Sequence, residues 1–282
     1  STNRLRFGTV DGALSSSLNR LPDSSLPFAV DTYCNISSEL DVAEPKSFAV
    51  FSSGLWKTQH LSRFLGGARL VYRPDDAALA QVDGVVCWGN KSTSRVAEIR
   101  AERHGKSLLR LEDGFFRSVR SGPRHPPLSL VLDDLGIYYD ARRPSRLEAW
   151  LNASGDVDAL ADSRLLVRAE RAIERVRTSR LSKYNDSDPR SRDLPASNDF
   201  VLVVDQTRGD ASVEYGLTPP TGFDDMLQAA LEENPGTEIV VKTHPDVLAG
   251  RKNGYLTRFR PSPRVTLLGA HVNPIELLTR AR

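Results

Sequence analysis

The amino-acid sequence predicts an α/β protein built on mostly parallel β-sheets. Short runs of branched and apolar residues recur along the chain, and stretches with helical spacing separate them. The runs are apolar throughout instead of alternating with polar residues, which is typical of strands covered on both faces. The 282 residues are 39% hydrophobic and 26% charged, a balance typical of a globular protein with room for two domains.

The first predicted domain covers residues 1–186 and is Rossmann-like. Strands are expected at residues 48–51, 69–72, 85–88, 107–111, 128–132 and 137–139, with a helix at 94–103 and a long helix at about 157–181. The last two strands flank a turn at residues 133–136. This order of strands and helices predicts one open sheet with helices on its faces.

The long helix carries two stripes of different character. Apolar residues at spacings of three and four predict a face that packs on the core, namely Leu166, Ala169, Ile173 and Val176. A basic stripe lies beside it, made of Arg164, Arg168, Arg171 and Arg175. A solvent-exposed basic face is the ordinary explanation, and contact with anionic lipid is the alternative. No aromatic residues interleave with the arginines, so we expect no nucleic-acid partner.

A polar stretch with two prolines, residues 187–199, predicts the linker between two domains. After it the pattern restarts, with strands expected at 200–204, 238–242 and 265–268 and helices at 223–231 and 274–279. A doubly wound domain usually has more than three strands. We therefore expect the second Rossmann-like domain, residues 200–282, to be incomplete.

Several classes of protein are excluded by what the sequence lacks. No apolar stretch is long enough to span a bilayer and no secretion pattern opens the chain, so we expect a cytoplasmic protein. Cys34 and Cys87 cannot build a disulfide framework, and Cys87 lies in an apolar run where a buried, reduced thiol is expected. The glycine-rich dinucleotide motif, the Walker loop and zinc-ligand spacings are absent.

One motif has the form of a metal site. Asp156-Val157-Asp158 matches the Asp-x-Asp pattern that holds a metal and a sugar diphosphate in some transferases. It does not follow a strand, and the start of a helix explains its acidic residues. We expect no metal ion.

Polar side chains follow three of the predicted strands, where open parallel sheets gather functional groups. Glu112-Asp113-Gly114 could aim an acid or base into a cleft, or simply end a strand with a turn. Residues 205–212 include Asp210 after a glycine, but Asp210 or Ser212 could merely cap a short helix.

The third cluster is Lys242-Thr243-His244-Pro245-Asp246. A lysine and a histidine at a strand end, with a proline fixing the exit of the chain, suit a phosphate leaving group better than a metal. A loop histidine with its hydrogen bonds satisfied remains the ordinary explanation.

Longer motifs connect these clusters and resemble the capsule polysaccharide β-Kdo transferases, the KpsC-like family. The matching segments are residues 111–119, 127–140, 182–185, 206–212 and 242–250. Kdo is an eight-carbon acidic keto sugar. The resemblance implies a GT-B-like fold of two Rossmann-like domains, the first on the acceptor side and the second on the donor side. It implies a retaining, metal-independent transfer from CMP-Kdo with no further cofactor.

The resemblance also implies roles for individual residues. Asp210 is expected to be the nucleophile, Glu112, with its neighbour Asp113, the acid/base carboxylate, and His244 the group that faces the donor phosphate. Lys242, Pro245, Gln206 and Ser212 would complete the donor side. Retention by double displacement needs such a pair: a carboxylate that attacks the anomeric carbon, then a base that activates the acceptor hydroxyl.

Family modules continue into a serine- and glycine-containing phosphate turn followed by a helix, and this chain ends before such an element. Three functions remain open. The first is Kdo transfer to a lipid-linked glycan in capsule biosynthesis, with peripheral contact to the inner membrane. The others are transfer of another CMP-activated acidic sugar, and a non-catalytic scaffold that binds capsule assembly or export proteins.

Overall fold

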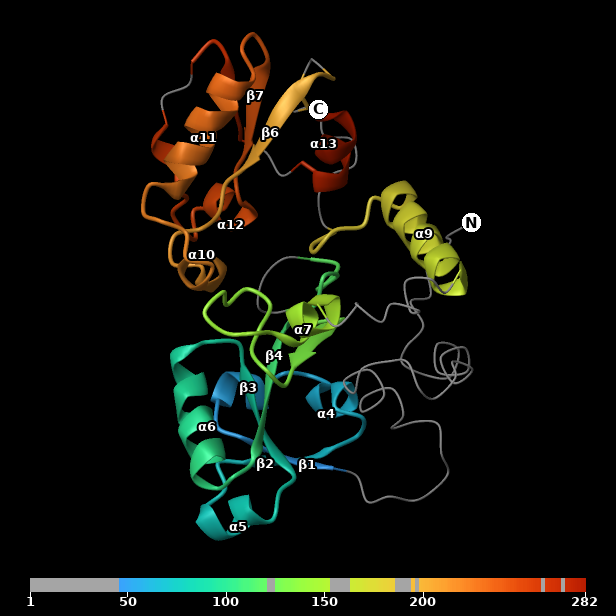
Figure 1. Ribbon diagram of the computed structural model, residues 1–282, viewed down its shortest axis with the longest axis vertical. Helices are drawn as coiled ribbons and strands as arrows, with labels where there is room; N and C mark the ends of the chain where they lie inside the picture. Colours follow the sequence, from blue (N-terminus) through green and yellow to red (C-terminus); the bar gives the residue numbers. More distant parts are fainter. Residues whose placement is uncertain are drawn as a thin grey trace. The chain divides into compact units, whose positions relative to one another are not determined.

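The computed structural model describes residues 46–120, 125–152, 163–185, 194–195, 198–259, 262–269 and 272–282 (Figure 1). The described chain forms two compact units. The first takes in the chain up to Glu112 with Leu130–Tyr138 and Pro144–Arg168, and the second takes in Asp113–Ser129, Tyr139–Arg143 and Ala169–Arg282. Each unit has its own sheet between helices, which confirms the predicted α/β class.

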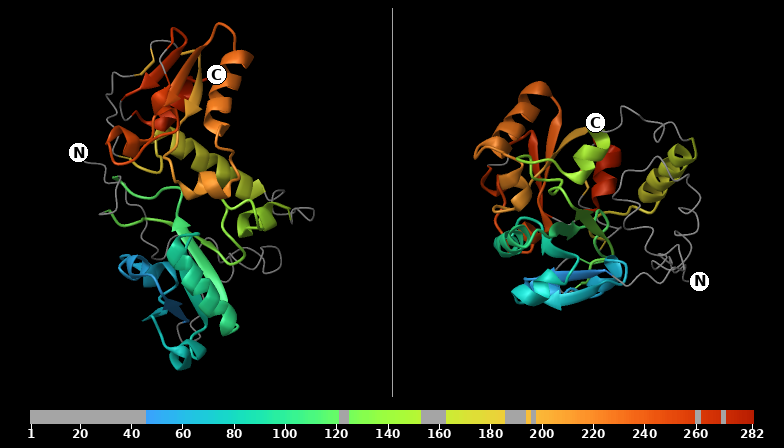
Figure 2. Two further views of the ribbon diagram at one scale, coloured as in Figure 1. Left: turned by 90° about the vertical axis from the view of Figure 1, so that its left-hand side faces the viewer. Right: turned by 60° about the horizontal axis from the view of Figure 1, so that its bottom comes forward.

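The first unit is built on a five-stranded sheet with the strand order β2-β1-β3-β4-β5. Pairing is parallel between β1 and β2, β1 and β3, and β3 and β4, and α6 packs along β3 (Figure 2). The elements are β1 Ser47–Val50, α3 Ser53–Trp56, α4 Leu61–Phe64, β2 Arg69–Tyr72, α5 Asp76–Ala80, β3 Gly84–Trp88, α6 Ser92–Arg103, β4 Ser107–Asp113, β5 Leu130–Asp133 and α7 Arg146–Asn152.

Both faces of this sheet are covered, which explains the continuous apolar runs of its strands. Val50 and Val86 belong to a core cluster on one face, whereas their neighbours Ala49 and Val85 belong to a second cluster on the other. Successive side chains of a strand point to opposite faces, so both sets are buried only when both faces are packed. Cys87 is buried and forms no disulfide, as predicted.

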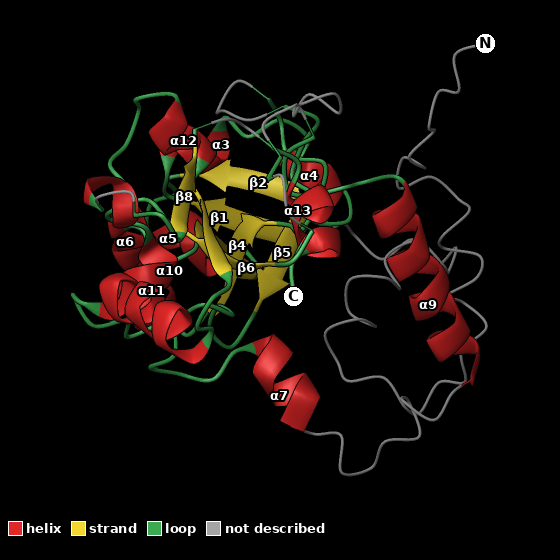
Figure 3. Ribbon diagram, turned by 90° about the horizontal axis from the view of Figure 1, so that it is seen from above, coloured by secondary structure: helices red, strands yellow, loops and turns green. Residues whose placement is uncertain are grey.

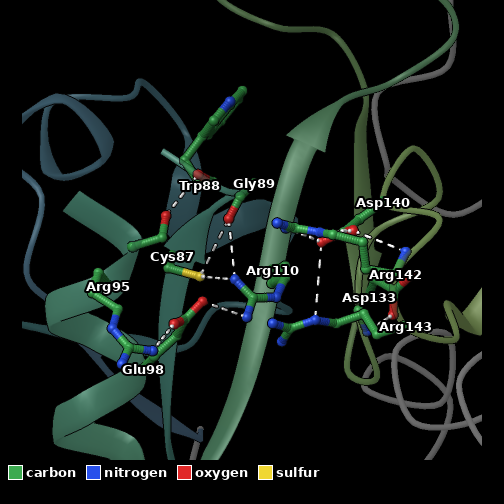
Figure 4. A network of polar contacts seen from close by, with 12 residues as sticks. Cys87, Trp88, Gly89, Arg95, Glu98, Arg110, Asp133, Asp140, Arg142 and Arg143 are labelled. Atoms are coloured by element: carbon green, nitrogen blue, oxygen red, sulfur yellow. Dashed lines mark hydrogen bonds and ion pairs between the residues drawn. The ribbon is translucent and has the colours of Figure 1, made fainter. Parts of the chain in front are cut away.

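Arg110 of β4 is a charged residue buried in this unit (Figure 4). Its Nη2 donates to Glu98 Oε1 at 2.7 Å, and its Nη1 donates to the carbonyl oxygen of Gly89 at 3.1 Å and contacts Cys87 Sγ at 3.6 Å. A buried guanidinium is tolerated only when its charge is paired and its donors are satisfied. This network ties β3, β4 and α6 together.

The second unit contains a three-stranded parallel sheet in the order β6-β7-β8. Leu227 of α11 packs on one face of the sheet and Leu277 of α13 on the other, so that these helices flank the strands (Figure 3). The elements are β6 Phe200–Val204, α10 Ala211–Tyr215, α11 Gly222–Glu233, β7 Glu238–Lys242, α12 Pro245–Leu248, the 3-10 helix η3 Leu256–Arg258, β8 Val265–Leu268 and α13 Pro274–Arg280.

The strand predicted at residues 137–139 is wrong, because Ile137 lies in irregular structure and residues 138–139 form a turn. The carboxylate of Asp133 orders the chain on either side of this segment. Its Oδ1 accepts the backbone N–H groups of Leu135 and Gly136, and its Oδ2 accepts that of Arg146. The preceding strand is confirmed but starts at Leu130, two residues later than expected.

The long helix α9, Ser163–Thr178, is confirmed in kind but not in its expected packing. The core stripe is wrong: Leu166 is 44% exposed and Ile173 59% exposed. Regular apolar spacing marks a helix face, but it does not reveal whether a partner covers that face. No helix of the described residues is long and apolar enough to cross a membrane.

Some predictions fall outside the described residues. These include the start of the long helix with Asp156-Val157-Asp158, and most of the expected linker at 187–199. The linker therefore stays a prediction.

The Arg110 network leads to a test of stability. Replacing Glu98 by Gln should lower the free energy of unfolding by about 3 kcal/mol, because the buried guanidinium loses its counter-charge. Arg95 pairs with the same carboxylate from the exposed side at 3.1 Å, so Arg95→Ala should change it by less than about 0.5 kcal/mol. Urea unfolding followed by circular dichroism measures both, and equal effects would contradict a special role for the buried pair.

Candidate functional site

The carboxyl ends of β6 and β7 bring two of the predicted polar clusters side by side. Val204 and Lys242 are partners in the parallel register, and the backbone N–H of Asp205 donates to the carbonyl oxygen of Lys242 at 3.0 Å. The segments that follow the two strands therefore start next to each other, as the parallel pairing requires.

Asp205 anchors this edge. Its carboxylate is buried, and Oδ1 accepts three backbone N–H groups, from Gln206 at 2.8 Å, Tyr255 at 3.0 Å and Leu256 at 3.1 Å. A Cβ atom at position 254 would collide with Asp205 Oδ2, so Gly254 lets the second segment approach. One buried carboxylate thus fixes the loop after β6 against residues 253–256.

Asp210 caps the short helix α10, as the ordinary explanation anticipated. Oδ1 accepts the backbone N–H of Ser212 at 2.9 Å and its hydroxyl at 2.7 Å. Oδ2 has no hydrogen-bond donor among the described residues. The carboxylate is therefore held by one oxygen while the other is available to a ligand.

His244 is held in one tautomer. It caps α12, and its Nδ1 accepts the backbone N–H of Asp246 at 3.0 Å, so that the neutral ring carries its proton on Nε2. Burial lowers the pKa of His244 below 6.5, the charges of Asp246 and Asp210 raise it, and those of Lys242 and Lys252 lower it. The result is a neutral imidazole at pH 7 that can donate a hydrogen bond from Nε2.

Lys242 ends β7 and is largely buried, and this desolvation lowers its pKa below 10.5. Within the described chain no carboxylate or carbonyl pairs with its Nζ. Pro245 occupies the first helical position of α12, where its missing N–H costs nothing. Gln206 turns its Oε1 onto the backbone N–H of Thr207 at 2.8 Å, so Gln206 and Ser212 shape the loop.

Tyr184 joins this neighbourhood, although its motif alone did not mark it as a site residue. Burial raises its pKa, the negative charges of Asp113, Asp246 and Asp210 raise it further, and the charge of Arg117 lowers it. Tyr184 and the three acids therefore share one electrostatic environment. Ser118 and Tyr184 form an isolated parallel β-bridge, which places the 182–185 motif beside the segment that follows Asp113.

The two neighbouring acids of the first cluster differ in their contacts. Glu112 lies in the first unit, where Trp88 Nε1 donates to its Oε1 at 3.0 Å. Asp113 lies in the second unit, where Arg117 Nε donates to its Oδ2 at 2.9 Å. The structure thus gathers Asp113, Asp210 and His244 in one unit and describes Glu112 in the other.

The described ranges contain no group of three or more His, Cys, Asp and Glu side chains that could hold an ion. What the edge of the second sheet offers is an open carboxylate oxygen on Asp210, a desolvated ammonium on Lys242 and an imidazole N–H on His244. This set suits a reaction at a carbon that carries an anionic leaving group.

Comparisons with known proteins point the same way. A family model described as "Capsule polysaccharide biosynthesis protein" matches residues 83–282. The chain is 41% identical over 238 residues to the capsule polysaccharide modification protein LipA of Neisseria meningitidis serogroup A, covering 83% of this chain and 32% of LipA. It is 34% identical over 212 residues to the lipopolysaccharide-processing protein LpsZ of Rhizobium meliloti, covering 71% of this chain and 47% of LpsZ.

Two solved structures also match. The β-Kdo 2,4 transferase of Thermosulfurimonas dismutans KpsC aligns with a TM-score of 0.74 at 42% identity, covering 85% of this chain and 73% of that one. The β-Kdo 2,7 transferase of the same protein aligns with a TM-score of 0.50 at 28% identity, covering 79% and 67%. The likeness confirms the GT-B-like fold class. The chain spans about a third of the length of LipA and about half of LpsZ.

The burial of His244 makes the site sensitive to pH. We expect its ring to titrate below pH 6.5 in NMR spectra, with the signal assigned by its loss in His244→Gln. As the pH falls the unfolded chain takes up this proton first, so His244 should reduce the free energy of unfolding below about pH 6.5. Adding CMP should raise the pKa, because a phosphate favours the charged ring. A midpoint at or above 6.5 without ligand would contradict the assigned burial.

Proposed function

Because the chain belongs to the capsule polysaccharide biosynthesis protein family, we propose that it is a glycosyltransferase module that moves Kdo from CMP-Kdo to a lipid-linked glycan acceptor. The observation that carries this proposal is the carboxylate of Asp210. One of its oxygens is fixed by Ser212, the other is open, and the charges of Asp210 and Lys242 both act on His244.

The first step is the attack of Asp210 on the sugar. Oδ2 forms a bond to the anomeric carbon, the bond from that carbon to the phosphate oxygen breaks, and CMP leaves with the electron pair. Lys242 and the Nε2–H of His244 stabilise the charge that develops on the phosphate. CMP is a good leaving group once these two residues stabilise its negative charge, so the proposal needs no metal ion.

The second step returns the sugar to an acceptor hydroxyl. The hydroxyl oxygen attacks the same carbon, the bond to Asp210 breaks, and a base takes the hydroxyl proton. Two inversions give retention. We assign the base to Glu112, whose orientation is fixed by Trp88, with Asp113 as the second candidate because its pairing with Arg117 already engages one oxygen.

Mass spectrometry of the intact chain tests the nucleophile. After incubation with CMP-Kdo, the chain should gain the mass of one Kdo, and Asp210→Asn should gain nothing because an amide is a poor nucleophile. Asp224→Asn, a matched change at an exposed site in the first turn of α11, should keep the gain.

Three other results have definite meanings. A gain on Asp210→Asn would show that another residue is the nucleophile. A gain from CMP-sialic acid but not from CMP-Kdo would replace Kdo by another acidic sugar. If nothing is gained while CMP still binds in calorimetry, covalent catalysis by this chain is refuted.

We also propose that the protein contacts the inner membrane surface through α9, where a lipid-linked acceptor would reside. The helix carries its four arginines on one side, and the apolar residues Leu166 and Ile173 beside them are exposed. Exposed apolar residues flanked by basic ones are typical of helices that lie in the headgroup region of anionic bilayers.

Flotation with liposomes tests this contact. The chain should float with vesicles that contain phosphatidylglycerol, and Arg168→Gln with Arg171→Gln should weaken binding roughly tenfold or more, at about 1 kcal/mol for each charge. The matched pair Arg95→Gln with Arg103→Gln, exposed arginines of α6, should have no such effect. Equal binding to neutral vesicles would contradict the proposal.

A further inference from the structure

Arg208 is an exposed residue of the loop between β6 and Asp210, and its backbone and side chain are both fixed. Its backbone N–H donates to the carbonyl oxygen of Asn253 at 2.7 Å, and its side-chain Nε donates to that of Gly254 at 3.0 Å. Gly209 follows with a φ of 76°, a left-handed conformation that turns the chain toward Asp210. These contacts fix the backbone of Arg208 and the Nε end of its guanidinium.

The guanidinium of Arg208 packs on a stack of two aromatic rings. Its Cζ lies 4.6 Å from the centroid of the Tyr255 ring, and Tyr255 stacks on Phe223 with centroids 4.3 Å apart and ring planes 8° apart. The backbone N–H of Tyr255 is bound by Asp205 Oδ1. A planar cation stacked on an anchored ring loses little side-chain freedom when it binds a ligand.

The outer edge of the guanidinium is unused. In the described part of the chain Arg208 forms no ion pair. Its side chain donates from Nε and stacks on the Tyr255 ring, which leaves both Nη groups for a ligand. Neither of the acids nearest in sequence pairs with it: Asp205 binds backbone N–H groups, and Asp210 binds Ser212 through Oδ1. A stacked guanidinium with an open pair of Nη donors matches a carboxylate in geometry and charge.

The proposed reaction supplies a reason for such a cation. In an activated keto acid the carbon that Asp210 attacks also bears the carboxylate of the sugar. The attack therefore brings two negative groups close together, and they repel each other. A cation beside the attacking residue offsets that repulsion, and Arg208 precedes Asp210 by two residues.

We propose that Arg208 binds the carboxylate of the acidic sugar and thereby selects keto-acid donors over neutral sugars. This inference rests on the proposed function, since it assumes that the sugar reacts at Asp210. A donor without the carboxylate leaves the guanidinium unpaired and gains nothing from it. The residue determines specificity, and its effect should appear on the sugar part of the donor and not on the nucleotide.

Calorimetric titrations of CMP and of CMP-Kdo into the same variants test the assignment. Arg208→Gln should weaken CMP-Kdo binding at least tenfold and change CMP binding less than twofold. Arg208→Lys should fall between, because an ammonium keeps the charge but loses the paired donors. Arg258→Gln, an exposed arginine of η3 in the same region, should leave both affinities unchanged.

The possible failures are distinguishable. Equal loss of CMP and CMP-Kdo binding in Arg208→Gln would place the guanidinium on the phosphate and overturn the carboxylate assignment. Unchanged affinity for both, or a change confined to the KM of the acceptor, would also overturn it while leaving the proposed transferase intact. If the unmodified chain binds neither ligand, the proposed function fails first and the inference fails with it.

Discussion

The candidate site depends on one buried carboxylate, that of Asp205. Parallel pairing of β6 and β7 sets the two strand ends side by side, but pairing stops at the sheet and does not order the loops beyond it. Asp205 Oδ1 extends the order by accepting N–H groups from both Gln206 and Tyr255. Burying a carboxylate is costly unless such donors replace water, and here three backbone donors do so. These hydrogen bonds of Asp205 position both the loop that leads to Asp210 and the Tyr255 ring on which Arg208 stacks.

The capping explanation of Asp210 and its proposed chemistry are compatible, because they use different oxygens. Capping engages Oδ1 with Ser212 and leaves Oδ2 open. A cap is usually interpreted as evidence against a catalytic role, yet here it limits the rotation of the carboxylate, which would set the direction of the proposed attack. His244 also uses its two polar atoms separately: Nδ1 caps α12, and Nε2 is left for a ligand.

The sequence predicted the strands well because apolar runs report burial on both faces, and it predicted the sheet edge because parallel strands align their ends. It could not predict contacts between residues far apart in the chain. The bond from Asp205 to Tyr255 spans 50 positions, and the stack of Arg208 on Tyr255 depends on it. The strand expected at 137–139 failed for a related reason. Ile137 is buried as a strand residue would be, but the Asp133 carboxylate holds the chain just before it, at Leu135 and Gly136, and the chain turns at residues 138–139.

The charges of the site favour the binding of an anionic ligand. Desolvation lowers the pKa of both Lys242 and His244, which means that the fold raises the free energy of their charged forms. No described side chain pairs with Lys242 Nζ or with the Nη groups of Arg208. A ligand that carries a phosphate next to a carboxylate supplies the missing counter-charges to both cations at once, and each contact strengthens as water leaves. A neutral sugar nucleotide would satisfy one of them, which is why the proposed role of Arg208 requires an acidic donor.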